Sequence, residues 1–194
     1  MGKATDHESV SIYQFTDEEI DALMKNAGEC VLNWATKDSW PVGVVHSFVW
    51  ANGKIWITFA AHRHRAAAIK RNDKVSVVVS SAANMDPEAG PWGQACCKGK
   101  ATFHDDRETL TWMYRLLSQK VGRGNKEVED DFYSLLDSPL RTCISVEPVK
   151  WITFNSYKSQ AHRAGTLDEN ELSAPASSDT ERMPAEMEKR GIDA

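Results

Sequence analysis

Residues 52–65, NGKIWITFAAHRHR, carry the clearest structural signals of this chain. Asn52-Gly53 is the strongest short signal for a β-hairpin, and the alternating residues 54–59 predict the strand that leaves the turn. Residues 43–50, GVVHSFVW, are rich in β-branched and aromatic side chains and predict the partner strand. The basic segment His62-Arg63-His64-Arg65 follows where the returning strand ends.

Outward from this hairpin, the pattern predicts a mainly β protein with peripheral helices. Residues 75–80 form a near-continuous apolar run, which predicts a strand buried on both faces. Further strands are expected at 30–35, 92–103 and 141–154, and helices at 16–27, 64–71, 106–121 and 126–136. Mostly antiparallel strands with a few helices favour a β-barrel over a doubly wound parallel sheet.

Local signals add detail to this outline. Thr16 and Glu19 have the spacing of a capping box at the start of the first helix. Gly99 is expected to mark a bulge, and Pro148 to interrupt one long final strand or to separate two shorter ones. On the two later helices, the residues expected to face inward are Leu110, Met113, Tyr114, Leu117 and Val121, then Val128, Phe132 and Leu135.

The length of 194 residues suits one domain with loose ends. We expect a flexible N-terminus over residues 1–15, a folded domain over residues 16–158 and a polar tail over residues 159–194. In the tail, acids outnumber bases and large apolar residues are isolated, so it cannot bury enough surface to offset its ordering entropy. We expect the tail to be disordered or to order only against a partner.

Charge and composition exclude several classes of function. The formal net charge is −5, and the one dense basic cluster, residues 63–74, is too short to follow a duplex, so no nucleic-acid partner is expected. No stretch approaches the ~20 apolar residues of a membrane span, and the acidic N-terminal region does not resemble a secretory signal. The expectation is a cytoplasmic protein whose four cysteines, at positions 30, 96, 97 and 143, stay reduced.

The basic segment at 62–65 has the residue types of an anion site. Backbone N–H groups at a helix start, together with Arg63 and Arg65, can hold a phosphate. Thr58 could add a hydroxyl hydrogen bond, Lys70 could reach the same anion, and His64 belongs to the segment itself. The alternative is a basic turn that is simply solvated, since runs of charge usually face water.

Other candidate residues carry weaker signals. Trp92 and Gln94 could cover and hydrogen-bond a flat heteroaromatic ring, although a core aromatic beside an edge glutamine is the more ordinary explanation. A metal site at His62 and His64 would need His46 as a third ligand and lacks a carboxylate nearby, so no metal is expected. His46 is the best candidate for a catalytic acid or base, because imidazole titrates near neutrality. No dinucleotide, P-loop, serine-hydrolase or zinc-protease motif occurs.

Together these segments resemble the flavin-binding split barrels of the pyridoxamine 5′-phosphate oxidase-like family. The likeness runs from about Glu29 to Phe154 and is carried by GVVHSFVW, GKIWITFAAHRHR, AAAIKRNDKVSVVV, WGQACCKGKATF and VKWITF. It implies an antiparallel split β-barrel that binds FMN. It also implies a homodimer with the cofactor sites at its interface and a small-molecule substrate.

The resemblance assigns positions to individual residues. Those it places at the cofactor are Val44 and His46 beside the isoalloxazine ring, Thr58, Arg63 and Arg65 near the phosphate and ribityl chain, Lys70, and Gln94 at the polar edge of the ring. Trp151 is implied to close the site from the second subunit.

The chain departs from the true oxidase of that family in two places. The oxidase has a Tyr-x-x-x-Arg-x-x-x-Ser pattern, whereas the helix here offers Tyr114 and Ser118 without the arginine between them. The oxidase also has a C-terminal Arg-x-His, whereas the tail here has only His162-Arg163. A vitamin B6 enzyme is therefore not expected.

Three functions follow from these patterns. The leading one is an FMN-dependent oxidoreductase of unknown substrate. The second keeps the fold but uses a deazaflavin coenzyme with a long acidic tail, for which Lys98 and Lys100, on one face of their strand, could supply basic groups. The third is a carrier or sensor of flavin or haem without turnover, since six histidines make haem conceivable.

Overall fold

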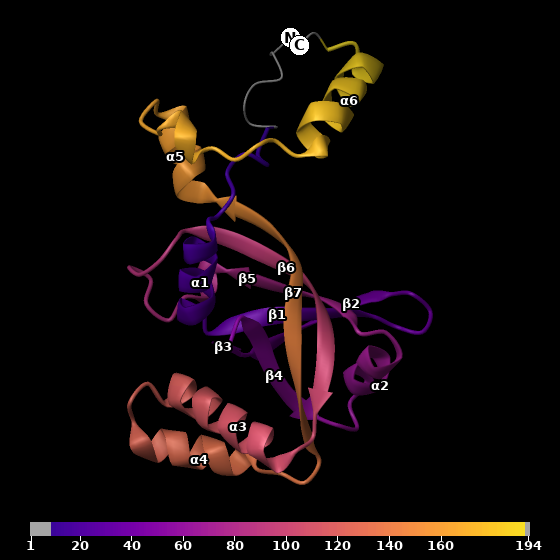
Figure 1. Ribbon diagram of the computed structural model, residues 1–194, viewed down its shortest axis with the longest axis vertical. Coiled ribbons are helices and arrows are strands. Elements are labelled where there is room, and N and C mark those ends of the chain that lie inside the picture. Colours follow the sequence, from indigo (N-terminus) through magenta and orange to yellow (C-terminus); the bar gives the residue numbers. More distant parts are fainter. Residues whose placement is uncertain (1–8, 193–194) are drawn as a thin grey trace.

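The computed structural model describes residues 9–192 (Figure 1). Its centre is a seven-stranded antiparallel sheet in the order β2-β1-β5-β6-β7-β4-β3. The strands are β1 (Glu29–Ala35), β2 (Pro41–Ser47), β3 (Val49–Ala51), β4 (Lys54–Ala60), β5 (Lys74–Ser80), β6 (Gly93–His104) and β7 (Arg141–Asn155). The helices are α1 (Asp17–Asn26), α2 (His64–Arg71), α3 (Arg107–Gly122), α4 (Lys126–Leu136), α5 (Ser156–Arg163) and α6 (Met183–Arg190), with short turns of helix at Ser81–Ala83, Glu169–Glu171 and Ser178–Arg182.

The sheet curls into a split barrel because two consecutive strands lie at its opposite edges. β2 pairs with β1 at one edge and β3 pairs with β4 at the other, yet only Phe48 separates them in the chain. The single strand expected over residues 43–50 is therefore wrong. The break occurs at Phe48 because its side chain turns into the core, where it is fully buried.

The hairpin expected at Asn52-Gly53 is confirmed. Both residues have positive φ angles, 53° and 68°, as a two-residue turn that matches strand twist requires. The strand that leaves it, β4, is buried from residue 55 to residue 59, because one face lies on the main core and the other lies under α3.

Two further strand predictions have different outcomes. β5 was expected to be buried on both faces but buries alternate residues, Val75, Val77 and Val79, while its other face is half-exposed. The final strand, β7, is one element of 15 residues. Its register with β6 shifts at Gly99, opposite Pro148, which confirms the bulge. A Cβ at Gly99 would lie 2.5 Å from Val146 Cγ1, so the close approach needs glycine there.

The helices cover different parts of the sheet (Figure 1). α1 carries the expected capping box of Thr16 and Glu19 and sends Leu23 and Met24 into the main core. α3 packs on the outside of β4 and β7, and α4 packs on α3. Because α4 has only this narrow contact, the inward positions predicted for Val128 and Leu135 are wrong; these side chains are 42% and 70% exposed. Val121, at the end of α3, is also exposed.

Residues near both ends of the described chain make contacts with the rest of the structure. Tyr13 and Phe15 are buried, and the Asn155 amide donates to the Tyr13 carbonyl, so the flexible segment predicted over 1–15 does not extend to these residues. Residues 1–8 lie outside the described part of the chain. The tail contains α5 and α6, and the Ser11 hydroxyl donates to Asp179 at 2.6 Å. That the tail orders against a partner stays a prediction.

None of the helices within residues 9–192 has the length and apolar character needed to cross a bilayer.

Candidate functional site

The basic turn joins the end of β4 to the start of α2. The turn is held by two backbone hydrogen bonds, from Ala61 N to Leu140 O and from Arg63 N to Ala60 O. Arg63 is the N-cap residue of α2, and its side chain makes no capping hydrogen bond to the first N–H groups of the helix. His62, Arg63 and His64 are exposed. The helix predicted over 64–71 is confirmed with these bounds.

Arg65 is the one residue of the segment that turns inward. Its guanidinium carbon lies 5.6 Å from the Trp34 ring centroid and 5.7 Å from that of Phe59. Its Nη1 donates to His46 Nε2. Because a guanidinium can only donate, His46 must accept at Nε2 and carry its proton on Nδ1. Val44 lies two residues before His46 on the same face of β2, so the structure brings Val44, His46 and Arg65 together.

Burial and charge set the protonation state of His46. Burial, and next the charge of Arg65, lower the pKa of His46 to about 4. Burial and the charge of Arg63 also lower the pKa of Arg65. The expectation that His46 titrates near neutrality is therefore wrong; its imidazole is neutral at pH 7 and receives a hydrogen bond from a cation.

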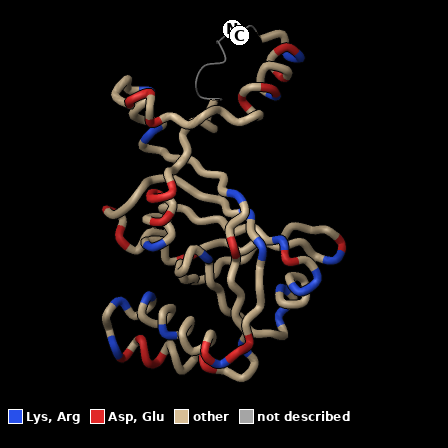
Figure 2. Tube along the Cα trace, viewed as in Figure 1, with Lys and Arg blue, Asp and Glu red and all other residues tan. Residues whose placement is uncertain are grey.

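Positive charge extends from the basic turn across the neighbouring strands. In Figure 2 the Lys and Arg positions gather on α2 and on the adjacent part of the central strands. Within residues 9–192, no carboxylate lies within ion-pairing distance of the cations at 63, 65, 70, 71, 74, 98, 100 and 150. An uncompensated group of cations of this kind attracts anions.

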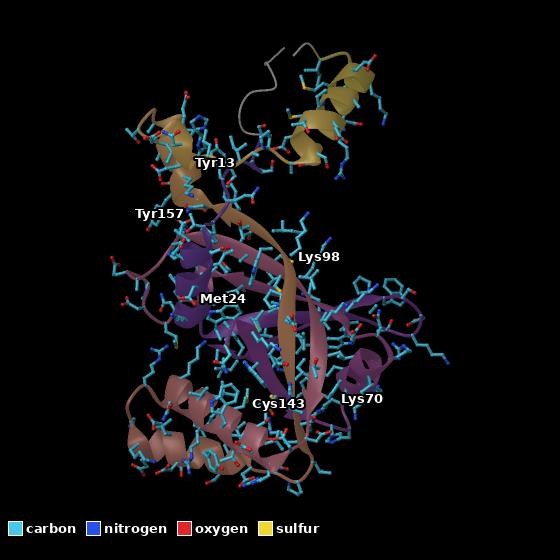
Figure 3. The ribbon with its side chains drawn as sticks, in the orientation of Figure 1. Tyr13, Met24, Lys70, Lys98, Cys143 and Tyr157 are labelled. Atoms are coloured by element: carbon cyan, nitrogen blue, oxygen red, sulfur yellow. The ribbon has the colours of Figure 1, made fainter. Side chains whose placement is uncertain are left out.

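A groove of about 470 Å³ lies within this positive region. Lys74, Lys98 and Lys100 border it, together with Asn33 and Ser76. Lys74 is in register with Lys100, which places the two on the same face of the sheet. Figure 3 labels Lys98 on the strands and Lys70 beside α2. The two-residue spacing of Lys98 and Lys100 predicted that both lie on one face of a strand. Lys74 lies beside them only because β5 pairs with β6.

Two residues that were predicted to bind the phosphate lie apart from the basic turn. Thr58 is buried, and its hydroxyl donates to Thr142 O at 2.8 Å. It faces α3 because it precedes Phe59, whose side chain points to the opposite face of β4. Thr58 is therefore not available to an anion at Arg65. Lys70 is exposed near the other end of α2, with Nζ 5.0 Å from the Phe103 ring centroid.

Gln94 and Trp92 lie on the other side of the sheet from His46. Gln94 is exposed and pairs with Ser80 and Phe154, whereas His46 pairs with the buried Cys30. Trp92 and Gln94 both border a pocket of about 260 Å³. Within one chain, the structure does not bring Gln94 to the Val44, His46 and Arg65 group.

Trp151 lies on β7, the strand that pairs with β6. Its ring makes an edge contact with Trp50, with centroids 6.2 Å apart, at the margin of the main core. It also borders, with Gln94, a groove of about 820 Å³ whose far wall is formed by residues of the C-terminal tail, including Arg182.

In the described residues, no three His, Cys, Asp or Glu side chains lie close enough together to hold a metal ion.

Known proteins share this fold. The family model described as pyridoxamine 5′-phosphate oxidase matches residues 16–155. A conserved hypothetical protein from Mycobacterium tuberculosis has a TM-score of 0.63 at 15% identity, covering 92% of this chain and 99% of its own. A protein of unknown function from Agrobacterium tumefaciens has a TM-score of 0.54 at 13% identity, covering 92% and 70%.

The haem storage protein from Vibrio cholerae has a TM-score of 0.52 at 13% identity, covering 72% of this chain and 96% of its own. No curated protein sequence matches the chain. At such low identities the structural likeness shows the fold.

Acidification should destabilise the wild type more than a His46→Gln variant, whose amide oxygen can still accept from Arg65. The pKa of His46 is about 4 in the folded state, against ~6.5 in the unfolded chain. The unfolded state therefore binds the extra proton between these values, and the stability that depends on neutral His46 is complete above pH ~6.5 and lost as the pH falls toward ~4. Because His46 is only half-buried, we expect the wild type to lose about 1–2 kcal/mol more unfolding free energy on acidification than the variant does.

Urea denaturation of both proteins at pH 7 and pH 4.5 measures this difference. An equal loss of unfolding free energy in the two proteins would contradict the assignment of a neutral, half-buried His46.

Proposed function

The chain belongs to the pyridoxamine 5′-phosphate oxidase family, matched over residues 16–155, and on that premise we propose that it is an FMN-binding oxidoreductase acting on a small molecule. The observation that carries the proposal is the basic turn at the start of α2. There, Arg63 and Arg65 have no carboxylate partner among residues 9–192, and they lie beside helix N–H groups that the N-cap side chain leaves uncapped.

The donors at this turn fit a phosphate. Guanidinium groups bind phosphate oxygens through paired N–H donors, and the start of a helix favours negative charge. Arg63 is exposed and free to reach an anion. Arg65 is held in place by Trp34, Phe59 and His46, which reduces the side-chain entropy lost on binding.

The neighbouring side chains fit the ring end of a flavin. A bound flavin would supply hydride or electron transfer, and the protein would supply orientation and electrostatics. Val44 and His46 offer an apolar contact and a neutral imidazole, and the charge of Arg65 beside them would favour an anionic reduced ring. His46 presents a donor at Nδ1 rather than a proton that exchanges near neutrality, so we assign it to binding.

A second copy of the chain would complete the site. Gln94 and His46 lie on opposite faces of one sheet, so both can touch a single ring only if they come from different subunits. Trp151 borders the same groove as Gln94 and would accompany it.

The exposed face of the sheet offers a surface for such a dimer. Strand pairing aligns Val45, Val31, Val78, Cys96 and Ile152 in one continuous row across five strands. Val45 and Ile152, at its two ends, are 56% and 51% exposed. A row of this kind on the surface is typical of a protein–protein interface.

Replacing Ile152 by Glu should convert a dimer into monomers, because a charge would have to be buried in the apolar row. Light scattering during gel filtration measures the mass. Leu135→Glu, which changes an equally apolar exposed residue on α4, should leave the dimer intact. A wild type that is monomeric at ~50 µM, well above ordinary dimer affinities, would refute the shared site.

A deazaflavin coenzyme with an acidic tail is the second candidate, and the groove bordered by Lys74, Lys98 and Lys100 favours it. This groove approaches the basic turn through Trp34, which borders the groove and whose ring centroid lies 5.6 Å from the guanidinium carbon of Arg65. Ammonium groups along a groove are suited to a chain of carboxylates, whereas FMN has no group that would need them.

A Lys98→Gln, Lys100→Gln double variant tests this candidate. It should bind a tailed deazaflavin about tenfold more weakly, at the upper range for two exposed ion pairs, and bind the same ring without its tail as the wild type does. Fluorescence titration measures both. An equal effect on the two compounds would argue against the groove as a tail site.

Purified protein should show the absorbance of a bound flavin, and Arg65→Ala should weaken FMN binding by roughly 10–100-fold, since a charged hydrogen bond contributes ~1.5–3 kcal/mol. Arg71→Ala removes the same charge from the far end of α2, where Arg71 donates to Ala35 O, and should change the affinity far less. Thermal unfolding of the ligand-free variants controls for loss of the fold.

The spectrum also separates the alternatives. A Soret band would favour a haem protein. The solved structure from Vibrio cholerae is described as a haem storage protein. A colourless protein that takes up neither FMN nor a deazaflavin in excess would end the proposal.

A further inference from the structure

A lysine without a carboxylate partner among residues 9–192 lies in the last turn of α3. Lys120 directs its ammonium group toward Phe48, with Nζ 3.9 Å from the ring centroid. Phe48 is the fully buried residue at which the chain passes between the two edges of the sheet. The ring supplies a cation–π contact, but a ring neutralises an ammonium less than a carboxylate does.

The charged and titratable groups near Lys120 do not compensate its charge. Among the described residues, no carboxylate forms an ion pair with it. Cys30, on β1, is the group that acts on it electrostatically, and burial raises the pKa of that thiol to about 12, so the thiol is neutral. Burial lowers the pKa of Lys120 to about 8.

A small pocket opens beside this amine. It has a volume of about 200 Å³ and is bordered by Lys120 together with Met85, Leu117 and Val121, which give it an apolar wall. Ser47 contributes a hydroxyl group, and Glu29 and Arg123 stand at the border as the remaining charged residues. Both of these are exposed, so they lie at the mouth of the pocket.

An amine in such a place is a nucleophile at neutral pH. At pH 7.4 roughly a fifth of Lys120 would be the free amine, against ~0.1% of an ordinary lysine. The pocket gives a small molecule access to it, the apolar wall excludes part of the water, and Arg123 can receive a negative charge at the entrance.

We propose that Lys120 is a covalent binding site for small aldehydes that carry an acidic group. The Nζ lone pair attacks the carbonyl carbon, the C=O π electrons move to the oxygen, and the proton lost by nitrogen passes to that oxygen to give a carbinolamine. Loss of water then forms the C=N bond of an imine. Neither of these reaction steps is an oxidation or a reduction. The acidic group of the aldehyde lies against Arg123.

Reductive trapping in the wild-type protein tests the proposal. Protein is incubated with glyoxylate and cyanoborohydride at pH 7.4, digested, and each lysine is quantified by mass spectrometry. Lys120 should be modified about tenfold faster than Lys25, an exposed lysine paired with Asp21, because more of it is unprotonated. Its rate should rise with pH and level off above pH ~8, whereas that of Lys25 should continue to rise.

Two comparisons define the site further. Arg123→Gln should slow trapping of glyoxylate at Lys120 while leaving trapping of the uncharged propanal unchanged. The proposal is overturned if Lys120 reacts no faster than Lys25 in the wild type. It is also overturned if Arg123→Gln has an equal effect on both aldehydes. The measurement compares lysines within one folded protein and is independent of flavin binding.

Discussion

The sheet owes its curled shape to the passage of the chain through Phe48. One buried aromatic separates β2 from β3, and these strands form the two edges of the sheet. A sheet whose consecutive strands lie at opposite edges must curl, so it acquires an inner face that is filled and an outer face that is open. Loss of that ring would remove the packing that holds the two edges together.

This separation of faces explains how the candidate flavin residues are distributed. His46 and Val44 lie on the inner face beside Arg65, and Gln94 lies on the outer face. A flavin site that uses all of them needs two chains. The same outer face carries the aligned apolar row and the lysine groove, so the proposed dimer surface and the proposed anion surface are neighbours on one sheet.

The environment of each charged side chain decides what it can do. Arg65 and Lys120 both lie against aromatic rings, and neither has a carboxylate partner within the described part of the chain. A guanidinium keeps its charge in such a place and suits a phosphate, whereas an ammonium loses part of its protonation and gains nucleophilic character. One fold can thus hold a permanent cation at one site and a reactive amine at another.

Several local elements were predictable because the residues that signal them lie close together in the chain. The turn at Asn52-Gly53, the capping box of α1, helix α2 with its basic start and the bulge at Gly99 follow from residues close together in the chain. Which strand faces are buried was not predictable in this way, because burial depends on what packs from outside: β4 is covered by α3 on its second face, whereas β5 is not. The same reason applies to three single residues: Thr58 is buried, Leu135 is exposed and His46 is neutral because of neighbours that are distant in sequence. Distant neighbours also bring Lys74 to the lysine groove and Lys120 to its pocket.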